Sequence, residues 1–266
     1  MLNYSIFKSE NPEAVWVTFV HGAGGSSSIW YKQIKDFQKH FHILLIDLRG
    51  HGKSKLAIYE KLKKYSFDVI GNEVVAVLDE LNIKSTHFIG ISLGTIIIRE
   101  ISERFPERTE SMILGGAVMK LNVKGQILMK SAWILQSIIP YLLMYKLLAF
   151  IIMPKKKNRE SRNLFVNESK KIYKKEFKRW FTLISQVNPM LRFFRIKDSG
   201  IPTLYVMGSE DYMFLPSISK LVKNHASSEL LIIENCGHVV NVEQPNLFNK
   251  KVIDYILFCN KSTLKF

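Results

Sequence analysis

Short apolar runs alternate with segments of helical periodicity along most of this sequence, and that alternation is its strongest constraint on the fold. The apolar runs predict strands at six places, over residues 15–20, 42–46, 85–89, 112–115, 203–207 and 230–233. The segments between them predict helices, of which the clearest are 30–39, 67–81 and 247–258. Strands that alternate with helices form a mostly parallel sheet with helices on both faces. The sequence therefore predicts an α/β fold.

The alternation breaks between Met119 and Gly200, where no convincing strand occurs. Apolar positions in this stretch recur at helical spacing, which predicts a helical insertion. We therefore expect an α/β core formed by residues 1–118 and 201–266, with residues 119–200 inserted as a helical cap. Its uncharged run, 131–145, is shorter than the roughly 20 residues that cross a bilayer. Cap helices around an apolar cavity are the favoured interpretation, and a cap helix in the plane of a membrane is the alternative.

The charge of the chain allows an anionic partner without requiring one. The formal net charge is +15, and eleven Lys or Arg against three Glu lie between Pro154 and Phe181. Such a stretch can attract nucleic acid or anionic lipid, and the cluster Lys155-Lys156-Lys157 could lie at lipid headgroups. No nucleic-acid-binding signature accompanies it, so a solvated lysine-rich helix face is the simpler explanation and we expect no nucleic-acid partner.

Cysteine usage and the first residues of the chain indicate a cytoplasmic protein. The two cysteines, Cys236 and Cys259, do not suggest a disulfide framework, which fits a reducing compartment. The first residues, Met1–Ser5, lack the basic and apolar regions of a signal peptide. No Cys/His cluster has the spacing of a zinc site, and we expect neither a metal nor a cofactor.

The motif Gly90-Ile91-Ser92-Leu93-Gly94 lies between a predicted strand and a predicted helix. Gly-x-Ser-x-Gly in that setting is typical of a nucleophile elbow, a tight and strained turn that exposes the serine hydroxyl above a sheet. The pattern has only three fixed positions and occurs by chance in many proteins. Its interpretation therefore depends on whether the chain also supplies a base, an acid and an oxyanion hole.

Candidates for the missing groups follow three of the predicted strands. His238 comes just after the last strand, and Asp211 follows the strand at 203–207, with Glu210 beside it as a second candidate acid. The order Ser92, Asp211, His238 is the one expected for a serine on an elbow, with His238 as base and Asp211 orienting its ring. Two backbone N–H groups would form the oxyanion hole, one from Leu93 and one from the loop 21–25, where Ala23 is the first choice and Gly24 the second.

With these motifs the chain closely resembles the α/β-hydrolase superfamily, over nearly its whole length. The motifs that carry the resemblance are His21-Gly22, Asp47-Leu48-Arg49-Gly50-His51-Gly52-Lys53-Ser54, the elbow at Ser92, Gly208-x-x-Asp211 and Gly237-His238. The resemblance implies about seven strands with a shortened opening, a structural loop after Asp47, and a cap where the insertion lies. An aspartate nucleophile, as in related dehalogenases, is excluded because residue 92 is serine.

Three reactions or roles remain open. The first is hydrolysis of a small-molecule carboxylic ester through an acyl-serine, as in a carboxylesterase or lipase. The apolar cap residues (Trp133, Ile134, Leu135, Ile138, Ile139, Leu142, Leu143) suggest an acyl group with hydrocarbon character, although helix packing explains them equally well.

The second possible reaction is elimination or carbon–carbon cleavage on an anionic substrate, as in the similar menaquinone-pathway synthases. A carboxylate of the substrate would then be held by cap arginines (Arg159, Arg162, Arg179, Arg192, Arg195). The third is a ligand-binding receptor with slow turnover. Oligomeric state stays open.

Overall fold

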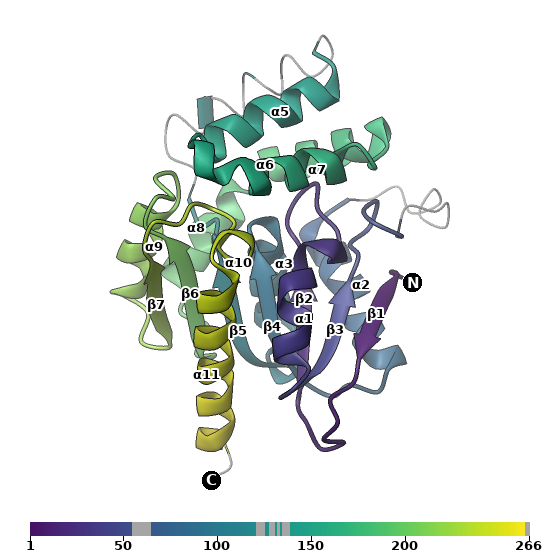
Figure 1. Ribbon diagram of the computed structural model, residues 1–266, viewed down its shortest axis with the longest axis vertical. Helices are drawn as coiled ribbons and strands as arrows, with labels where there is room; N and C mark the ends of the chain where they lie inside the picture. Colours follow the sequence, from purple (N-terminus) through teal and green to yellow (C-terminus); the bar gives the residue numbers. More distant parts are fainter. Residues whose placement is uncertain (55–64, 121–125, 128–130, 132–133, 135–138, 264–266) are drawn as a thin grey trace.

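A seven-stranded sheet forms the centre of the molecule, as Figure 1 shows. The structure, a computed structural model, describes residues 1–54, 65–120, 126–127, 131, 134 and 139–263. The strands are β1 (Tyr4–Phe7), β2 (Trp16–Val20), β3 (His42–Ile46), β4 (Thr86–Ile91), β5 (Thr109–Gly115), β6 (Thr203–Gly208) and β7 (Ser228–Ile233). Their order is β1-β3-β2-β4-β5-β6-β7, and only β1 pairs antiparallel, with β3. The predicted mostly parallel sheet of seven strands is confirmed.

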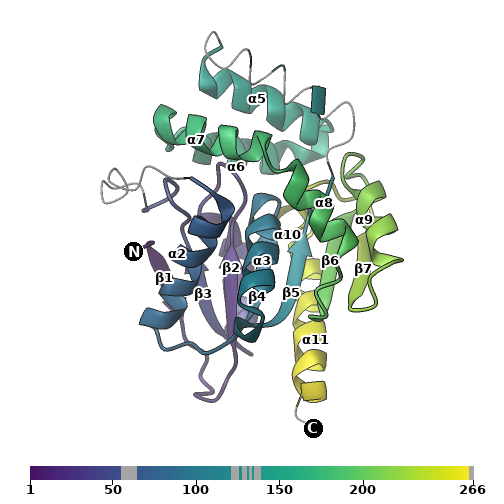
Figure 2. The same ribbon diagram turned by 180° about the vertical axis from the view of Figure 1, so that it is seen from behind.

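Helices cover both faces of the sheet, as the two opposite views show (Figures 1 and 2). One face carries α1 (Tyr31–Phe37), α10 (Val240–Glu243) and α11 (Pro245–Thr263); the other carries α2 (Phe67–Glu80), α3 (Leu93–Arg104), α8 (Asn188–Ile196) and α9 (Leu215–Val222). Short 3₁₀ helices are η1 (Ser27–Trp30), η3 (Pro106–Arg108) and η4 (Lys156–Asn158). The helix predicted over 30–39 is thus η1 continued by α1, and the last helix is longer than predicted.

Burial on both faces explains why the strands read as continuous apolar runs. Along β2, Val17 and Phe19 pack in the cluster beneath α1 and α11, whereas Val20 packs in the cluster beneath α2 and α3. Side chains alternate between the two faces of a strand, so a strand covered on both sides needs apolar residues at every position. The two clusters form the core on either side of the sheet.

The remaining helices lie across the carboxyl edge of the sheet (Figure 1). They are α5 (Tyr141–Ile152), α6 (Arg159–Ser169) and α7 (Lys174–Ser185), which follow β5 in the chain and precede β6. Aromatic and aliphatic side chains of α5 and α7, among them Tyr145, Phe177 and Phe181, form a separate cluster. Because the carboxyl ends of parallel strands share one edge, these helices roof the loops that follow β2, β4, β6 and β7.

The predicted helical insertion is therefore present between β5 and β6, but its exact limits stay a prediction. Within the predicted range 119–200, α8 places Leu191 and Phe194 in the core cluster on the sheet rather than against α5 and α7. Three apolar residues expected in the cap, Trp133, Leu135 and Ile138, lie outside the described residues. None of the helices in the described segments is long and apolar enough to span a membrane.

Candidate active site

Ser92 occupies the turn between β4 and α3 in a strained conformation. Its φ is 54° and its ψ is −117°, a positive-φ region that non-glycine residues rarely adopt. The flanking glycines are required by close packing. A Cβ on Gly90 would collide with Ile98, and a Cβ on Gly94 would collide with the carbonyl oxygen of Val20. The turn is therefore as tight as Gly-x-Ser-x-Gly predicts, and α3 begins directly after the serine.

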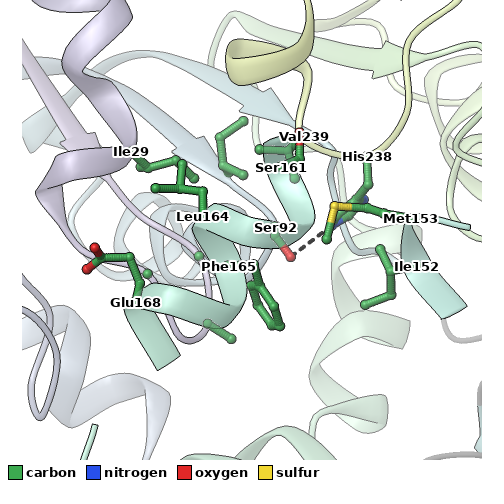
Figure 3. A pocket seen from close by; sticks show the side chains of 14 residues that line it. Ile29, Ser92, Ile152, Met153, Ser161, Leu164, Phe165, Glu168, His238 and Val239 are labelled. Atoms are coloured by element: carbon green, nitrogen blue, oxygen red, sulfur yellow. Dashed lines mark hydrogen bonds between the residues drawn. The ribbon is translucent and has the colours of Figure 1, made fainter. Parts of the chain in front are cut away.

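The structure brings Ser92, His238 and Asp211 together in one hydrogen-bonded chain. Nε2 of His238 lies 3.0 Å from Oγ of Ser92 (Figure 3), and Nδ1 of the same ring lies 2.7 Å from Oδ2 of Asp211. A carboxylate only accepts, so Nδ1–H donates to Asp211 and leaves Nε2 to accept from the Ser92 hydroxyl. Asp211 and His238 are 1% and 3% exposed. This arrangement can remove a proton from Ser92 as its oxygen attacks an electrophile.

The two adjacent acids, Glu210 and Asp211, point to different partners. Asp211 accepts from His238 and also from the N–H of Phe214, 3.3 Å away. Glu210 instead pairs with Lys155 at 2.9 Å and Lys157 at 2.7 Å, and these hydrogen bonds hold the pKa of its carboxyl below the usual range. Glu210 therefore links the loop after β6 to the cap, and Asp211 is the acid placed on the histidine.

The two predicted oxyanion N–H groups flank Ser92 without acceptors of their own. Ala23 and Ser92 line the same cavities, and Leu93 follows Ser92 at the first turn of α3. Among the residues that the structure describes, neither the Ala23 N–H nor the Leu93 N–H has a hydrogen-bond acceptor. The second choice, Gly24, has one, because its N–H donates to Nε2 of His51 over 3.1 Å. This difference favours Ala23 over Gly24 as the second donor.

His21 and His51 are buried, and their rings form hydrogen bonds between loops rather than with Ser92. Nε2 of His21 accepts from the N–H of Leu48 at 3.0 Å, and its Nδ1 donates to the carbonyl of Gly22 at 2.7 Å. The Nδ1 atom of His51 donates to the carbonyl of Arg49 at 3.0 Å. Burial lowers the pKa of both rings, to about 3 for His51, where repulsion from His21 adds to the effect. Both rings are therefore neutral and connect the loop after β2 to the loop after β3.

The loop that follows Asp47 has a structural role, as the resemblance implies. Asp47 accepts from the N–H of Ser27 at 2.7 Å and from the N–H of Lys53 at 2.8 Å. The hydroxyl of Ser54 donates to the Asp47 carbonyl at 2.7 Å. The Asp47 side chain thereby closes its own loop and anchors the segment that leads from the loop 21–25 into η1.

Two cavities meet at Ser92, and both are roofed by the cap. The smaller has a volume of about 560 Å³, part of it also open to solvent, and is lined by His238, Ser161, Leu164 and Glu168, among others (Figure 3). The larger has a volume of about 940 Å³, part of it open to solvent. Its lining is apolar or aromatic apart from Ser92, and includes Leu93, Leu148, Phe177, Trp180, Phe181 and Phe214. The hydroxyl of Ser92 is thus accessible from two sides.

Tyr145 is a site residue that the motifs did not reveal. It lies on α5, is 5% exposed and lines the larger cavity. Its ring and hydroxyl cover Gly24, within 3.2 Å of where a Cβ would stand. Among the described residues its hydroxyl has no hydrogen-bond partner, and burial raises its pKa, so it is a neutral donor beside the loop 21–25. No spacing rule connects a cap tyrosine to a loop 120 positions earlier, so only the three-dimensional structure reveals that Tyr145 lies beside this loop.

The five cap arginines proposed as carboxylate ligands do not line either cavity. Arg162 donates to the carbonyls of Met153 and Lys155, and Arg179 pairs with Glu176. Arg195 donates to the carbonyl of Met119, and Arg159 and Arg192 are exposed. Of the described residues around the two cavities, Glu168 is the only one with a carboxylate, and none is Lys or Arg. In the segments that the structure describes, no group of His, Cys, Asp or Glu could hold a metal ion.

Comparison with known proteins shows a matching family and several distant relatives of the chain. A family model described as the alpha/beta hydrolase fold matches residues 15–245. 3-Oxoadipate enol-lactonase 2 of Acinetobacter baylyi is 25% identical, over 94% of this chain and 91% of the relative. The pimeloyl-[acyl-carrier protein] methyl ester esterase of Wigglesworthia glossinidia brevipalpis is 28% identical, over 92% and 94%. The crystal structure of the enol-lactonase from Burkholderia xenovorans superposes with a TM-score of 0.78 at 20% identity, covering 96% of each chain.

Proposed function

The chain belongs to the α/β-hydrolase fold family, and from that membership we propose that it hydrolyses small-molecule carboxylic esters through an acyl intermediate on Ser92. The observation that carries the proposal is the 3.0 Å contact between Nε2 of His238 and Oγ of Ser92 at the junction of two cavities. Both curated relatives described above are named for ester or lactone substrates, in which the same acyl–oxygen bond is broken.

In the proposed reaction, Oγ of Ser92 attacks the ester carbonyl while Nε2 of His238 takes the hydroxyl proton. Asp211 stabilises the imidazolium that forms, and the N–H groups of Leu93 and Ala23 stabilise the oxyanion. When the tetrahedral intermediate collapses, His238 returns the proton to the departing alkoxide and the acyl group stays on Ser92. Water then attacks the acyl enzyme with His238 again as base, which releases the carboxylic acid and restores the serine.

The position of His238 supports a separate role for each cavity in holding the two halves of the ester. His238 lines the smaller cavity and not the larger, and the group that it protonates must lie beside it. We therefore propose that the alcohol half occupies the smaller cavity. The acyl half occupies the larger cavity, whose lining of Leu148, Phe177 and Trp180 suits a hydrocarbon chain.

Tyr145 adds a third donor to this scheme. Its hydroxyl is buried beside Gly24 and faces no acceptor among the described residues, so a bound ester is its natural partner. We propose that it donates to the ester as charge develops on the carbonyl, and so acts from the cap on the same group as the oxyanion loop. Closure of the cap over the substrate would then complete the set of donors.

The lyase alternative finds less support in the lining of the cavities. An anionic substrate needs a cation near the reacting carbon, yet the arginines that could supply one are paired elsewhere or exposed. Glu168, which lines the smaller cavity, would repel a carboxylate. A receptor with slow turnover shares every feature of the hydrolase site and differs only in rate.

We also propose a cytoplasmic location. Cys236 and Cys259 are both buried and form no disulfide in the part of the chain that the structure describes, and burial raises the pKa of Cys236 to about 12. Buried thiols that stay protonated are the expected condition in a reducing compartment.

The test combines a covalent probe with a series of esters. The wild-type protein should react with a fluorophosphonate and hydrolyse p-nitrophenyl esters, and Ser92→Ala should abolish labelling and lower kcat at least about a thousandfold. Ser219→Ala is the matched control, because that hydroxyl donates to Leu215 on α9, away from both cavities. Retention of labelling and hydrolysis in Ser92→Ala would refute the mechanism. Conversion of a dicarboxylate without ester hydrolysis would favour the lyase, and slow single turnover with a large ligand-induced rise in Tm would favour the receptor.

A further inference from the structure

The outward face of α5 is a stripe of exposed apolar side chains. Leu143, Leu147 and Phe150 are 48%, 49% and 59% exposed. They stand four and three residues apart, so they lie on one side of the helix, together with exposed Lys146. Figures 1 and 2 show α5 as the outermost helix of the cap, farthest from the sheet. The stripe therefore faces away from the sheet and from the other cap helices that the structure describes.

The positive charge of the chain is concentrated in the same part of the sequence. Residues 119–200 hold eighteen of the 38 Lys and Arg but only four of the 23 Asp and Glu, a formal net charge of +14. The rest of the chain carries +1. A lysine-rich composition shared by the whole chain would have charged both parts alike. The nearly neutral core shows that biased composition does not explain the charge, and the excess of positive charge belongs to the cap.

Basic residues lie at both ends of the stripe. At the end of α5, Lys155 and Lys156 are exposed, and the guanidinium of Arg162 lies 4.7 Å from the ring centre of Phe150. At its beginning, the hydroxyl of Tyr141 donates to the carbonyl of Ile172 over 3.3 Å. That bond brings the start of α5 to a second exposed basic group, which comprises Lys170, Lys171, Lys174 and Lys175 around exposed Tyr173.

We propose that the cap docks on an anionic lipid surface, with α5 lying in the plane of the membrane. Leu143, Leu147 and Phe150 would enter the boundary between headgroups and acyl chains, and the basic groups at either end would contact the headgroups. Nucleic acid offers no apolar surface to the stripe. A second copy of this chain is disfavoured, because it would oppose two strongly positive caps. An anionic bilayer matches both the apolar stripe and its charge.

Docking in this orientation has a consequence for the catalytic site, which rests on the proposed function. The opposite side of α5 carries Tyr145, Leu148 and Ile152, all of which line the larger cavity. One helix would therefore contact the lipid with one side and the acyl-binding cavity with the other. A membrane-dissolved ester would meet the protein at the wall of the cavity that accepts its acyl chain.

The direct test is flotation of the full chain with lipid vesicles, which reads binding independently of catalysis. The wild type should bind vesicles that contain about 30 mol% phosphatidylglycerol, and should bind phosphatidylcholine vesicles at least about tenfold more weakly. Raising the salt concentration should weaken binding to the anionic vesicles, because screening shortens the reach of the basic groups. Absence of binding to anionic vesicles, or equal binding to both kinds, would overturn the proposal.

Paired variants identify the surface. The double variant Leu147→Ser and Phe150→Ser should weaken binding at least about tenfold while short-chain ester hydrolysis stays unchanged, since neither residue lines a cavity. Leu247→Ser with Phe258→Ser is the matched control, because these residues are 40% and 65% exposed on α11, which packs against the sheet outside the cap (Figure 1). Equal loss in the control, or a dimer in solution that dissociates only in the α5 variant, would refute docking through α5.

A charge variant covers the case in which the apolar variant fails to fold. Lys156→Glu with Lys174→Glu alters one exposed residue at each end of the stripe and leaves the stripe itself intact. This variant should lose affinity for the anionic vesicles and not for the neutral ones. Unchanged affinity for the anionic vesicles would contradict the proposed orientation.

Discussion

The backbone N–H of Gly24 donates to Nε2 of His51 over 3.1 Å, and this bond fixes the loop that carries the proposed oxyanion donor. The same imidazole donates to the carbonyl of Arg49, so one neutral ring joins the loop after β2 to the loop after β3. The bond occupies the Gly24 N–H, whereas the N–H of Ala23 in the same loop has no acceptor among the described residues. The neutral form of His51, which lines neither cavity, thus helps to hold this loop in place.

Acidification should destabilise the fold through His51. Its pKa is about 3 in the folded protein and about 6.5 in an unfolded chain, so between these values the unfolded state binds a proton that the folded state does not. The free energy of unfolding should therefore fall as pH falls from 7 to 5, with His51 contributing about 1 to 2 kcal/mol of that loss. His21, whose pKa is also lowered, acts in the same direction.

The variant His51→Gln tests this prediction, because glutamine keeps a donor and an acceptor without titrating. Urea unfolding at both pH values should show a smaller loss of unfolding free energy for this variant. Exposed His40→Gln is the control, and identical losses in all three proteins would contradict the prediction.

Asp211→Asn and Glu210→Gln should have very different effects on kcat. The amide at residue 211 can no longer hold the imidazole in its tautomer or stabilise the imidazolium, so kcat should fall about a thousandfold to ten-thousandfold. Among the described residues the Glu210 carboxylate pairs with two cap lysines, and its amide should leave kcat within about threefold, because exposed ion pairs contribute little. Steady-state kinetics on one activated ester compares the two, and a larger loss in Glu210→Gln would reverse the assignment.

Sequence patterns predict the sheet well because both of its faces are buried. Strands such as β3 and β6 are apolar at every position, which gives a strong local signal. β1 contains four half-buried residues on the edge of the sheet, and only the family resemblance suggested it. The choice between Glu210 and Asp211 could not be read from sequence, because it depends on which way the chain leaves β6. The hydrogen bond of the Gly24 N–H and the position of the Tyr145 hydroxyl beside Gly24 likewise depend on residues far apart in the chain, so no local sequence pattern predicts them.

Tyr145→Phe should lower activity without lowering stability. The Tyr145 hydroxyl bonds to no described residue, so its removal should leave Tm unchanged, while loss of a bond to the transition state should lower kcat/KM about tenfold to a hundredfold. Tyr141→Phe on the same helix should do the opposite, because its hydroxyl donates to the carbonyl of Ile172 and faces neither cavity. Thermal unfolding and ester kinetics on both variants form the measurement. Equal kinetics in the two would remove Tyr145 from the site.

Filling each cavity in turn should separate acyl from alcohol specificity. Val118→Phe adds bulk only to the larger cavity and should lower kcat/KM for an octanoate ester more than for an acetate ester, by about tenfold. Leu164→Phe adds bulk only to the smaller cavity and should instead discriminate between large and small alcohol groups. The measurement is a matrix of four esters against three proteins. If Leu164→Phe shortened the accepted acyl chain, the assignment of the cavities would be inverted.

Replacement of Ser92 should reveal the free energy that its backbone conformation costs. Glycine adopts a positive φ without the clash that a Cβ causes, whereas alanine retains that clash. The free energy of unfolding of Ser92→Gly should therefore exceed that of Ser92→Ala by about 1 kcal/mol, with both variants inactive. Chemical denaturation of the two proteins provides the comparison. Equal stability would mean that the elbow stores no measurable strain at this residue.

Ser92 and His238 are hydrogen-bonded across 146 residues of sequence, from the middle of the sheet to the loop that follows its edge strand β7. Contacts between residues so distant in the chain form late in folding, because a large loop must close before they can be made. Because Asp211 follows β6 and His238 follows β7, the serine can meet its partners only in a chain whose sheet includes both strands. Recovery of the serine's reactivity during refolding should therefore report the completed sheet, with no added label required.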